Sequence, residues 1–156
     1  MARVLVAGIG NIFLGDDGFG PEVIRRVGEL PQAGVRVVDY GIGGMHLAYD
    51  LLDGWDALIL VDAVPDQGRP GEIRVFEADP SVSNGPLGLD AHSVDPATVF
   101  ASLRALGGTP PRTIVVGCQV ADISDRIGLS THVGAAVPDA VQAVRRAVEM
   151  AVAQCV

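Results

Sequence analysis

Short apolar runs alternate with amphipathic segments along the whole chain of 156 residues. Residues 4–7, 57–61 and 113–118 are rich in Val, Ile and Leu, which is typical of parallel strands buried on both faces. Residues 21–30 and 131–152 instead space their apolar side chains three and four positions apart, and this spacing predicts helices. The alternation predicts an α/β fold: an open, mainly parallel twisted sheet of about five strands, one of them antiparallel, sandwiched between helices.

The remaining segments fit the same alternation. Residues 57–61 form the most apolar run and are expected to be the central strand. The turn at residues 65–71 is too short for a crossover helix, so the strand after it should return antiparallel to the strand before it. Further elements are expected at residues 34–40 (strand), 45–52 (helix), 72–76 (strand) and 96–106 (helix, capped by Asp95, with Leu106 facing inward). Pro138 is expected to kink the last helix or to mark its true first turn.

Length and charge limit the class of protein. A chain of this length is expected to form a single domain over residues 1–156. Its formal net charge is -8, all 11 basic residues are Arg, and no basic stripe is present. Such a surface repels phosphate backbones, so we expect no nucleic-acid partner. No apolar run approaches the roughly 20 residues that a bilayer-spanning helix needs, so we expect no membrane association.

The cysteines and the first residues indicate the compartment. Cys118 and Cys155 lie far from one another in a chain that has no other cysteine, which is not the pattern of a disulfide framework. The apolar start of the chain is interrupted by Gly8 and Gly10 and is followed by acidic residues, unlike a secretory signal peptide. We therefore expect a reduced, cytoplasmic protein, and we expect it to be a monomer.

Three side chains with metal-binding chemistry are predicted near the carboxyl ends of strands. Asp17 follows the first strand, Asp62 ends the third, and His92 closes the long loop after the fourth. Ligands of open α/β sheets bind beyond these strand ends, and neighbouring strands lie only about 4.8 Å apart. Two carboxylates and one imidazole, with positions left open, suit a divalent transition metal such as nickel, zinc or iron.

Each of these residues also has an ordinary structural interpretation that the pattern alone leaves open. Asp16 and Asp17 could cap the first helix, Asp62 could form a turn, and His92 could be solvated. A dinucleotide-binding loop is disfavoured because Phe13 stands where that motif needs Gly or Ala. The paired aspartates would also repel a polyphosphate unless a metal lay between them.

The first loop carries a specific motif. It reads Gly-Ile-Gly-Asn at residues 8–11 and Gly-Asp-Asp-Gly-Phe-Gly-Pro at residues 15–21. This motif resembles the opening signature of the hydrogenase maturation endopeptidases, which trim the C-terminus of nickel-iron hydrogenase large subunits. The similarity spans nearly the whole chain and continues at residues 39–45, 61–63, 117–119 and 127–130.

The resemblance implies a metal site made by Asp17, Asp62 and His92, which are therefore also the catalytic candidates. Asp16 would be a helix-capping or supporting neighbour, and the turn at residues 39–44 would contact the substrate peptide. In the family the nickel arrives bound to cysteines of the precursor large subunit, and zinc or cadmium is expected to substitute for it in crystals. The resemblance thus implies that the three side chains complete the coordination of a substrate-borne nickel, which acts as a template or also as a Lewis acid or water activator.

The implied activity is removal of the C-terminal extension of a nickel-loaded hydrogenase large-subunit precursor. The sequence offers no Ser-His-Asp set, no activated Cys and no His-Glu-x-x-His motif that would indicate another protease class. One alternative is a non-catalytic sensor or chaperone that binds the metal-loaded precursor without cutting it. Another is a peptidyl-tRNA hydrolase-like enzyme on a similar fold, but such an enzyme needs a basic face and the net charge of -8 argues against it.

Overall fold

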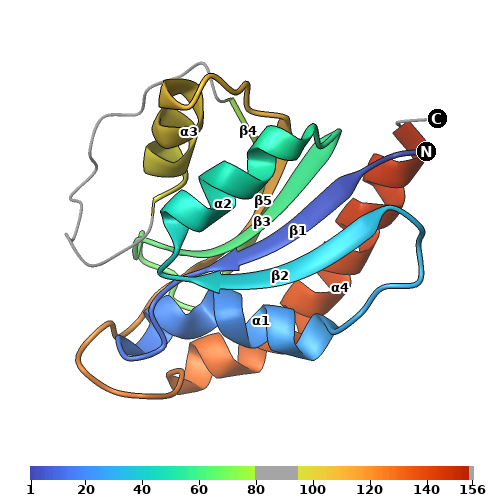
Figure 1. Ribbon diagram of the computed structural model, residues 1–156. Coiled ribbons are helices and arrows are strands. Elements are labelled where there is room, and N and C mark those ends of the chain that lie inside the picture. Colours follow the sequence, from blue (N-terminus) through green and yellow to red (C-terminus); the bar gives the residue numbers. More distant parts are fainter. Residues whose placement is uncertain (80–94, 155–156) are drawn as a thin grey trace.

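The computed structural model describes residues 1–79 and 95–154, which form an open α/β sandwich (Figure 1). Within these ranges the sheet has five strands in the order β2-β1-β3-β5-β4, and β3 is central, as its apolar run predicts. β1, β2, β3 and β5 are parallel, while β4 is antiparallel to β5. The predicted fold class is confirmed. The strands are β1 (Val4–Ile9), β2 (Val35–Gly41), β3 (Ala57–Val64), β4 (Ile73–Ala78) and β5 (Arg112–Gln119).

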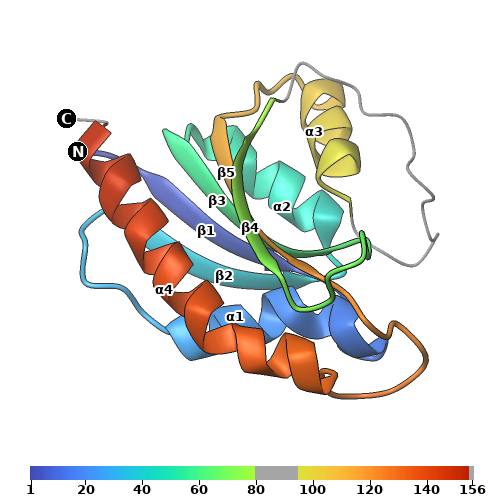
Figure 2. The same cartoon turned by 180° about the vertical axis from the view of Figure 1, so that it is seen from behind.

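Helices cover both faces of the sheet. Figures 1 and 2 show α1 and α4 on one face and α2 and α3 on the other, and each pair seals its own aliphatic core. The helical segments are η1 (Gly15–Gly18), α1 (Phe19–Val27), α2 (Gly44–Asp50), η2 (Leu51–Asp53), α3 (Pro96–Ala105) and α4 (Thr131–Gln154). Along the described parts of the chain, none of the helices has the combined length and apolarity to cross a membrane.

In α3 one detail agrees with the prediction and another differs, and in α4 one of the two alternatives for Pro138 is excluded. Asp95 caps α3 as expected, since its side chain accepts a hydrogen bond from the backbone N–H of Ala97 at 3.0 Å. Leu106, however, lies just past the end of α3 and is 39% exposed rather than buried. Pro138 lies inside α4, seven residues after Thr131 opens the helix, so it does not mark the first turn.

β4 runs antiparallel to β3, as the short turn predicts, but the two strands are not neighbours. β5 lies between them. The reason lies in the turn before β4, which is bound to the end of β5. The buried side-chain oxygen of Gln119 accepts hydrogen bonds from the backbone N–H groups of Gln67 and Arg69, and the Gln119 carbonyl accepts one from Gly71. These bonds hold the turn against the end of β5, so that β4 begins on the far side of β5 from β3.

The carboxyl end of β3 extends beyond its pairing with β1. β1 pairs with β3 only as far as Gly8 and Val61, whereas β3 continues to Val64. Asp62 therefore lies within β3 and not at its end, in the part of the strand that no longer pairs with β1. Since side chains alternate along a strand, Asp62 is on the same face as Leu58 and Leu60, the face that α2 and α3 cover.

Glycines allow the start of α1 to lie directly against these strand ends. A Cβ atom on Gly20 would lie 2.4 Å from the carbonyl oxygen of Ile9 and 2.5 Å from that of Val61. A Cβ atom on Gly10 would lie 2.0 Å from the carbonyl oxygen of Asp17. The glycine-rich motif is thus a packing requirement that brings Asp17 close to β3.

Candidate functional site

Asp17 lies in η1, between β1 and α1, and is 7% exposed. Its carboxylate Oδ2 accepts a hydrogen bond of 2.7 Å from the backbone N–H of Asn11. Its own backbone N–H donates to the carbonyl of Leu14. A carboxylate held by a short bond to a backbone donor is well oriented, since such charge-assisted bonds are among the stronger ones. Helix capping is not its role, because α1 has Gly18 at its N-cap and no side-chain cap bond.

Asp62 lies in β3 and is 5% exposed. Burial raises its pKa well above the ordinary value, and the negative charges of Asp17 and Asp95 raise that pKa further. The backbone N–H of Ala63 opposes this change only partly. Asp17 and Asp62 thus form an acidic pair at the carboxyl edge of the sheet. A cation placed between them would relieve both the desolvation of Asp62 and the repulsion.

The third predicted ligand, His92, lies outside the described residues. Within residues 1–79 and 95–154, no group of three or more His, Cys, Asp or Glu side chains could hold a metal ion. Asp17 and Asp62 bring two carboxylates to this edge of the sheet, and a metal bound between them would need further ligands.

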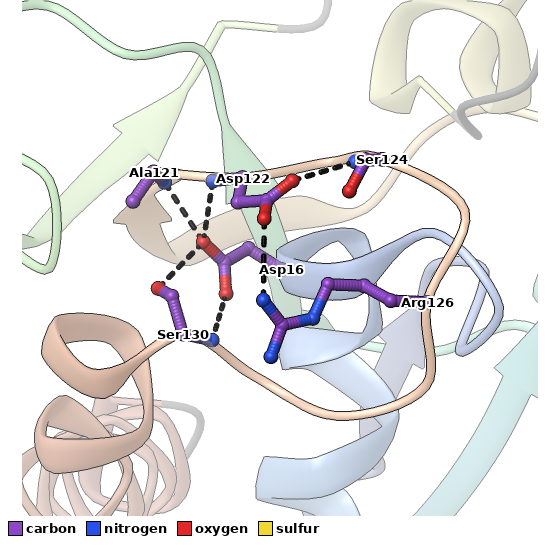
Figure 3. A network of polar contacts seen from close by, with 6 residues as sticks. All are labelled: Asp16, Ala121, Asp122, Ser124, Arg126 and Ser130. Atoms are coloured by element: carbon purple, nitrogen blue, oxygen red, sulfur yellow. Dashed lines mark hydrogen bonds and ion pairs between the residues drawn. The ribbon is translucent and has the colours of Figure 1, made fainter.

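Of the two roles expected for Asp16, helix capping and support of its neighbour, the structure excludes capping, because neither η1 nor α1 has a side-chain cap bond. Its buried carboxylate accepts four hydrogen bonds from the segment between β5 and α4 (Figure 3). The donors are the backbone N–H groups of Ala121, Asp122 and Ser130 and the hydroxyl of Ser130, at 2.7–2.9 Å. Burial alone would raise the pKa of Asp16, but these bonds outweigh it and hold that pKa below the ordinary value. Sequence reasoning missed these contacts because the donors lie more than 100 residues away.

The same two segments are joined along their backbones. Arg126 donates its N–H to the carbonyl of Phe13 at 3.1 Å, and its own carbonyl accepts the N–H of Gly15 at 2.9 Å. The Arg126 side chain forms a 3.2 Å ion pair with Asp122, which Figure 3 places beside Asp16. Backbone hydrogen bonds therefore join the segment at residues 120–130 to the segment at residues 11–18, which contains Asp17.

Exposed apolar side chains lie in the segments that follow the carboxyl ends of β1, β2 and β5, and of these segments the sequence indicated a binding role only for the turn at residues 39–44. They project from the loop after β1, the loop and helix after β2, and the loop after β5. They are Ile12, Phe13, Ile42, Met45, Tyr49, Ile123 and Ile127, each at least 42% exposed. Apolar side chains gathered near a polar site are typical of surfaces that bind a partner. Their signal in the sequence was the presence of large apolar residues in, or next to, turns rich in glycine and aspartate.

The turn between β2 and α2 has a defined conformation. The Asp39 carboxylate accepts a hydrogen bond from the N–H of Gly41 at 2.9 Å, and the carbonyl of Tyr40 accepts one from Gly43. The Tyr40 hydroxyl donates to Asp50 at 2.7 Å. Its burial, together with this contact to a carboxylate, raises the pKa of Tyr40. These bonds define the conformation of the turn that carries the exposed Ile42.

Comparison with known proteins identifies the family. A family model described as hydrogenase maturation protease matches residues 22–147. The chain is 34% identical over 150 residues to the coenzyme F420 hydrogenase subunit delta of Methanothermobacter thermautotrophicus, covering 90% of this chain and 91% of the relative. It is 30% identical over 146 residues to the hydrogenase 2 maturation protease of Escherichia coli, covering 91% and 88%.

A solved structure agrees with the sequence comparisons. The hydrogenase maturating endopeptidase HybD from Escherichia coli superposes with a TM-score of 0.81 at 27% identity. The superposition covers 95% of this chain and 93% of that one. The match therefore covers nearly the whole chain. Taken together with the family model, these similarities show that the chain belongs to the hydrogenase maturation protease family, whose members are endopeptidases.

Proposed function

We propose that this protein removes the C-terminal extension of a nickel-iron hydrogenase large-subunit precursor and acts on the precursor that already carries nickel. The observation that supports this proposal best is the buried pair Asp17 and Asp62 at the carboxyl edge of the sheet. We further propose that the protein acts as a monomer in the cytoplasm, in keeping with the free thiol of Cys118.

In this proposal the nickel belongs to the substrate. Asp17, Asp62 and His92 supply the ligands that the cysteines of the precursor leave open. Asp17 is oriented for this by the N–H of Asn11, and Asp62 is held on β3 within reach of the negative charge of Asp17. Zinc or cadmium could occupy the same ligand set in the absence of nickel.

The electrostatics of the pair explain how metal loading would control cleavage. A nickel-free tail brings no positive charge, so the desolvation of Asp62 and its repulsion by Asp17 stay uncompensated. A nickel-loaded tail removes both costs, and it therefore binds with its scissile bond in a defined position. Hydrolysis adds one water across that peptide bond and leaves a new carboxyl terminus on the large subunit and a new amino terminus on the released tail. A bound divalent ion can polarise a carbonyl or lower the pKa of a water.

The test is cleavage of a nickel-loaded precursor by single-site variants, followed by mass spectrometry. Asp17→Ala, Asp62→Ala and His92→Ala should each abolish shortening of the precursor while circular dichroism reports an intact fold. Asp139→Ala changes an exposed carboxylate on α4 and serves as the matched control, which should cleave normally.

Two results would contradict the proposal. Normal trimming by all three site variants would show that the site is elsewhere. Binding of the precursor by the wild-type protein without any shortening would show a non-catalytic sensor instead of an endopeptidase.

A further inference from the structure

The carboxylate of Asp16 uses both of its oxygens. Oδ2 accepts hydrogen bonds from the N–H groups of Ala121 and Asp122 and from the hydroxyl of Ser130, and Oδ1 accepts one from the Ser130 N–H. The side chain is fully buried. Each of the three N–H groups is a backbone donor that cannot reverse its role. The pocket around Asp16 therefore requires an acceptor on both sides.

Asparagine has the same shape but cannot meet that requirement. If its oxygen faces Ala121 and Asp122, its NH2 group faces the N–H of Ser130, donor against donor. If the amide is reversed, the NH2 group faces two backbone donors instead of one. Buried donors without acceptors are costly, so either orientation pushes the segment at residues 121–130 away from η1.

Asp16 and Asp17 are consecutive residues of η1, and η1 is held from two sides. On one side lies the segment after β5, bonded through the Asp16 carboxylate and through the Asp16 N–H, which donates to the carbonyl of Asp122 at 2.8 Å. On the other side lies the end of β1, where the N–H of Asn11 donates to the Asp17 carboxylate. The orientation of Asp17 therefore depends on both attachments.

We infer that Asp16 is a positioning residue for the site: it holds η1 against the segment after β5 and thereby fixes the direction of the Asp17 carboxylate. The inference about cleavage rests on the proposed function, whereas the geometric link between Asp16 and Asp17 does not. Side chains that orient metal-binding ligands commonly affect the chemistry without touching the substrate. A displacement of about 1 Å at a catalytic group can cost on the order of 100-fold in rate.

The amide of Asn11 reports on Asp17 directly. Its N–H is bonded to the Asp17 carboxylate at 2.7 Å, so its proton resonance should lie downfield in a 15N-resolved NMR spectrum of the wild-type protein. In Asp16→Asn that resonance should move upfield and its hydrogen exchange should accelerate. A purely structural role of Asp16, confined to the segment after β5, would leave the Asn11 amide unchanged.

The closing experiment combines this spectrum with cleavage kinetics on nickel-loaded precursor. Asp16→Asn should shift the Asn11 amide and lower kcat/KM by about 10- to 100-fold. Ser130→Ala, which removes one of the four bonds, should change both quantities in the same direction but less. Asp139→Asn is the matched control: it makes the same change at an exposed carboxylate on α4, outside the segments that hold Asp16, so both quantities should stay at their wild-type values.

Each result has a defined meaning. The inference is overturned if the chemical shift of the Asn11 amide in Asp16→Asn is the same as in wild type, or if kcat/KM is unchanged. If Asp16→Asn does not fold, Ser130→Ala decides, and an unshifted Asn11 amide in that variant overturns the inference as well. If wild-type protein leaves the precursor uncut, the proposed function fails, while the NMR comparison still tests the link between Asp16 and Asp17.

Discussion

Asp16 and Ser130 are separated by 114 residues in the chain, yet the Asp16 carboxylate accepts hydrogen bonds from both the backbone N–H and the hydroxyl of Ser130, at 2.7 and 2.8 Å. Ser130 directly precedes α4, and Asp16 directly precedes Asp17. The first loop of the protein is thus attached to the last loop before its C-terminal helix. The acidic pair at the carboxyl edge of the sheet depends on this long-range attachment.

Replacing Ser130 by Ala should lower the free energy of unfolding by about 1 kcal/mol, because it removes one hydrogen bond to a buried carboxylate while the backbone bond remains. Urea denaturation followed by circular dichroism measures the change. Asp125→Ala, which changes an exposed side chain of the same segment, should leave the denaturation midpoint where it is. A Ser130→Ala midpoint equal to that of wild type would mean that the hydroxyl contributes nothing.

Asp62→Asn should make the protein more stable at pH 8 while abolishing its activity. Burial and the charge of Asp17 raise the pKa of Asp62, so the folded protein binds this proton more tightly than the unfolded chain, whose Asp pKa is about 3.9. The protonated Asp62 therefore contributes its full stabilisation of the fold below pH 3.9. This stabilisation is lost as the pH rises through the raised folded-state pKa of Asp62. Asparagine cannot ionise and avoids this loss.

Thermal unfolding of Asp62→Asn and wild type across a pH series tests whether the variant is the more stable of the two at high pH. The variant should melt a few degrees higher at pH 8, and the difference should vanish near pH 3. A variant that melts lower than wild type at pH 8 would show that the ionised Asp62 is stabilised in the folded protein.

The sheet could be predicted from the sequence because its signal is local. The apolar run at residues 57–61 correctly indicated the central strand, and the alternation of runs and amphipathic segments indicated the parallel arrangement. The partner of β4 could not be predicted, because it depends on Gln119 binding the turn at residues 65–71. A short connection makes its two strands neighbours only when no residue distant in the sequence binds the turn between them.

The candidate site was predictable only in part, for a similar reason. The positions of Asp17 and Asp62 at one rim follow from strand order and from the rule that ligands bind at carboxyl ends. The role of Asp16 does not follow, because a carboxylate at the start of a helix usually suggests capping. Its donors belong to a segment that only the folded chain brings near.

Gly20→Ala should destabilise the protein by about 3 kcal/mol, because its Cβ atom would overlap the carbonyl oxygens of Ile9 and Val61. Both are backbone atoms of strands, so α1 would have to move away from the sheet and carry Asp17 with it. Gly134→Ala provides the control in α4, where the nearest atom is 3.9 Å away and alanine should stabilise the helix by up to about 1 kcal/mol. Chemical denaturation of both variants tests this, and similar effects of the two substitutions would refute the packing argument.

Cys118 should resist alkylation in the folded protein. Burial raises the pKa of its thiol to about 12, with a smaller contribution from the charge of Asp16, so almost no thiolate exists at pH 8. In a Cys155→Ser background, mass spectrometry should find the native protein unmodified after exposure to iodoacetamide and the urea-unfolded protein fully modified. Equal rates in the two states would place the Cys118 thiol within reach of solvent.

The most direct test of the central claim compares two forms of one hydrogenase large-subunit precursor, nickel-loaded and nickel-free, incubated with the wild-type protein. Intact-mass spectrometry measures the loss of the C-terminal extension over time. We expect shortening of the nickel-loaded form only, because only that form brings a positive charge to the carboxylates of Asp17 and Asp62. Equal shortening of both forms, or of neither, would contradict it.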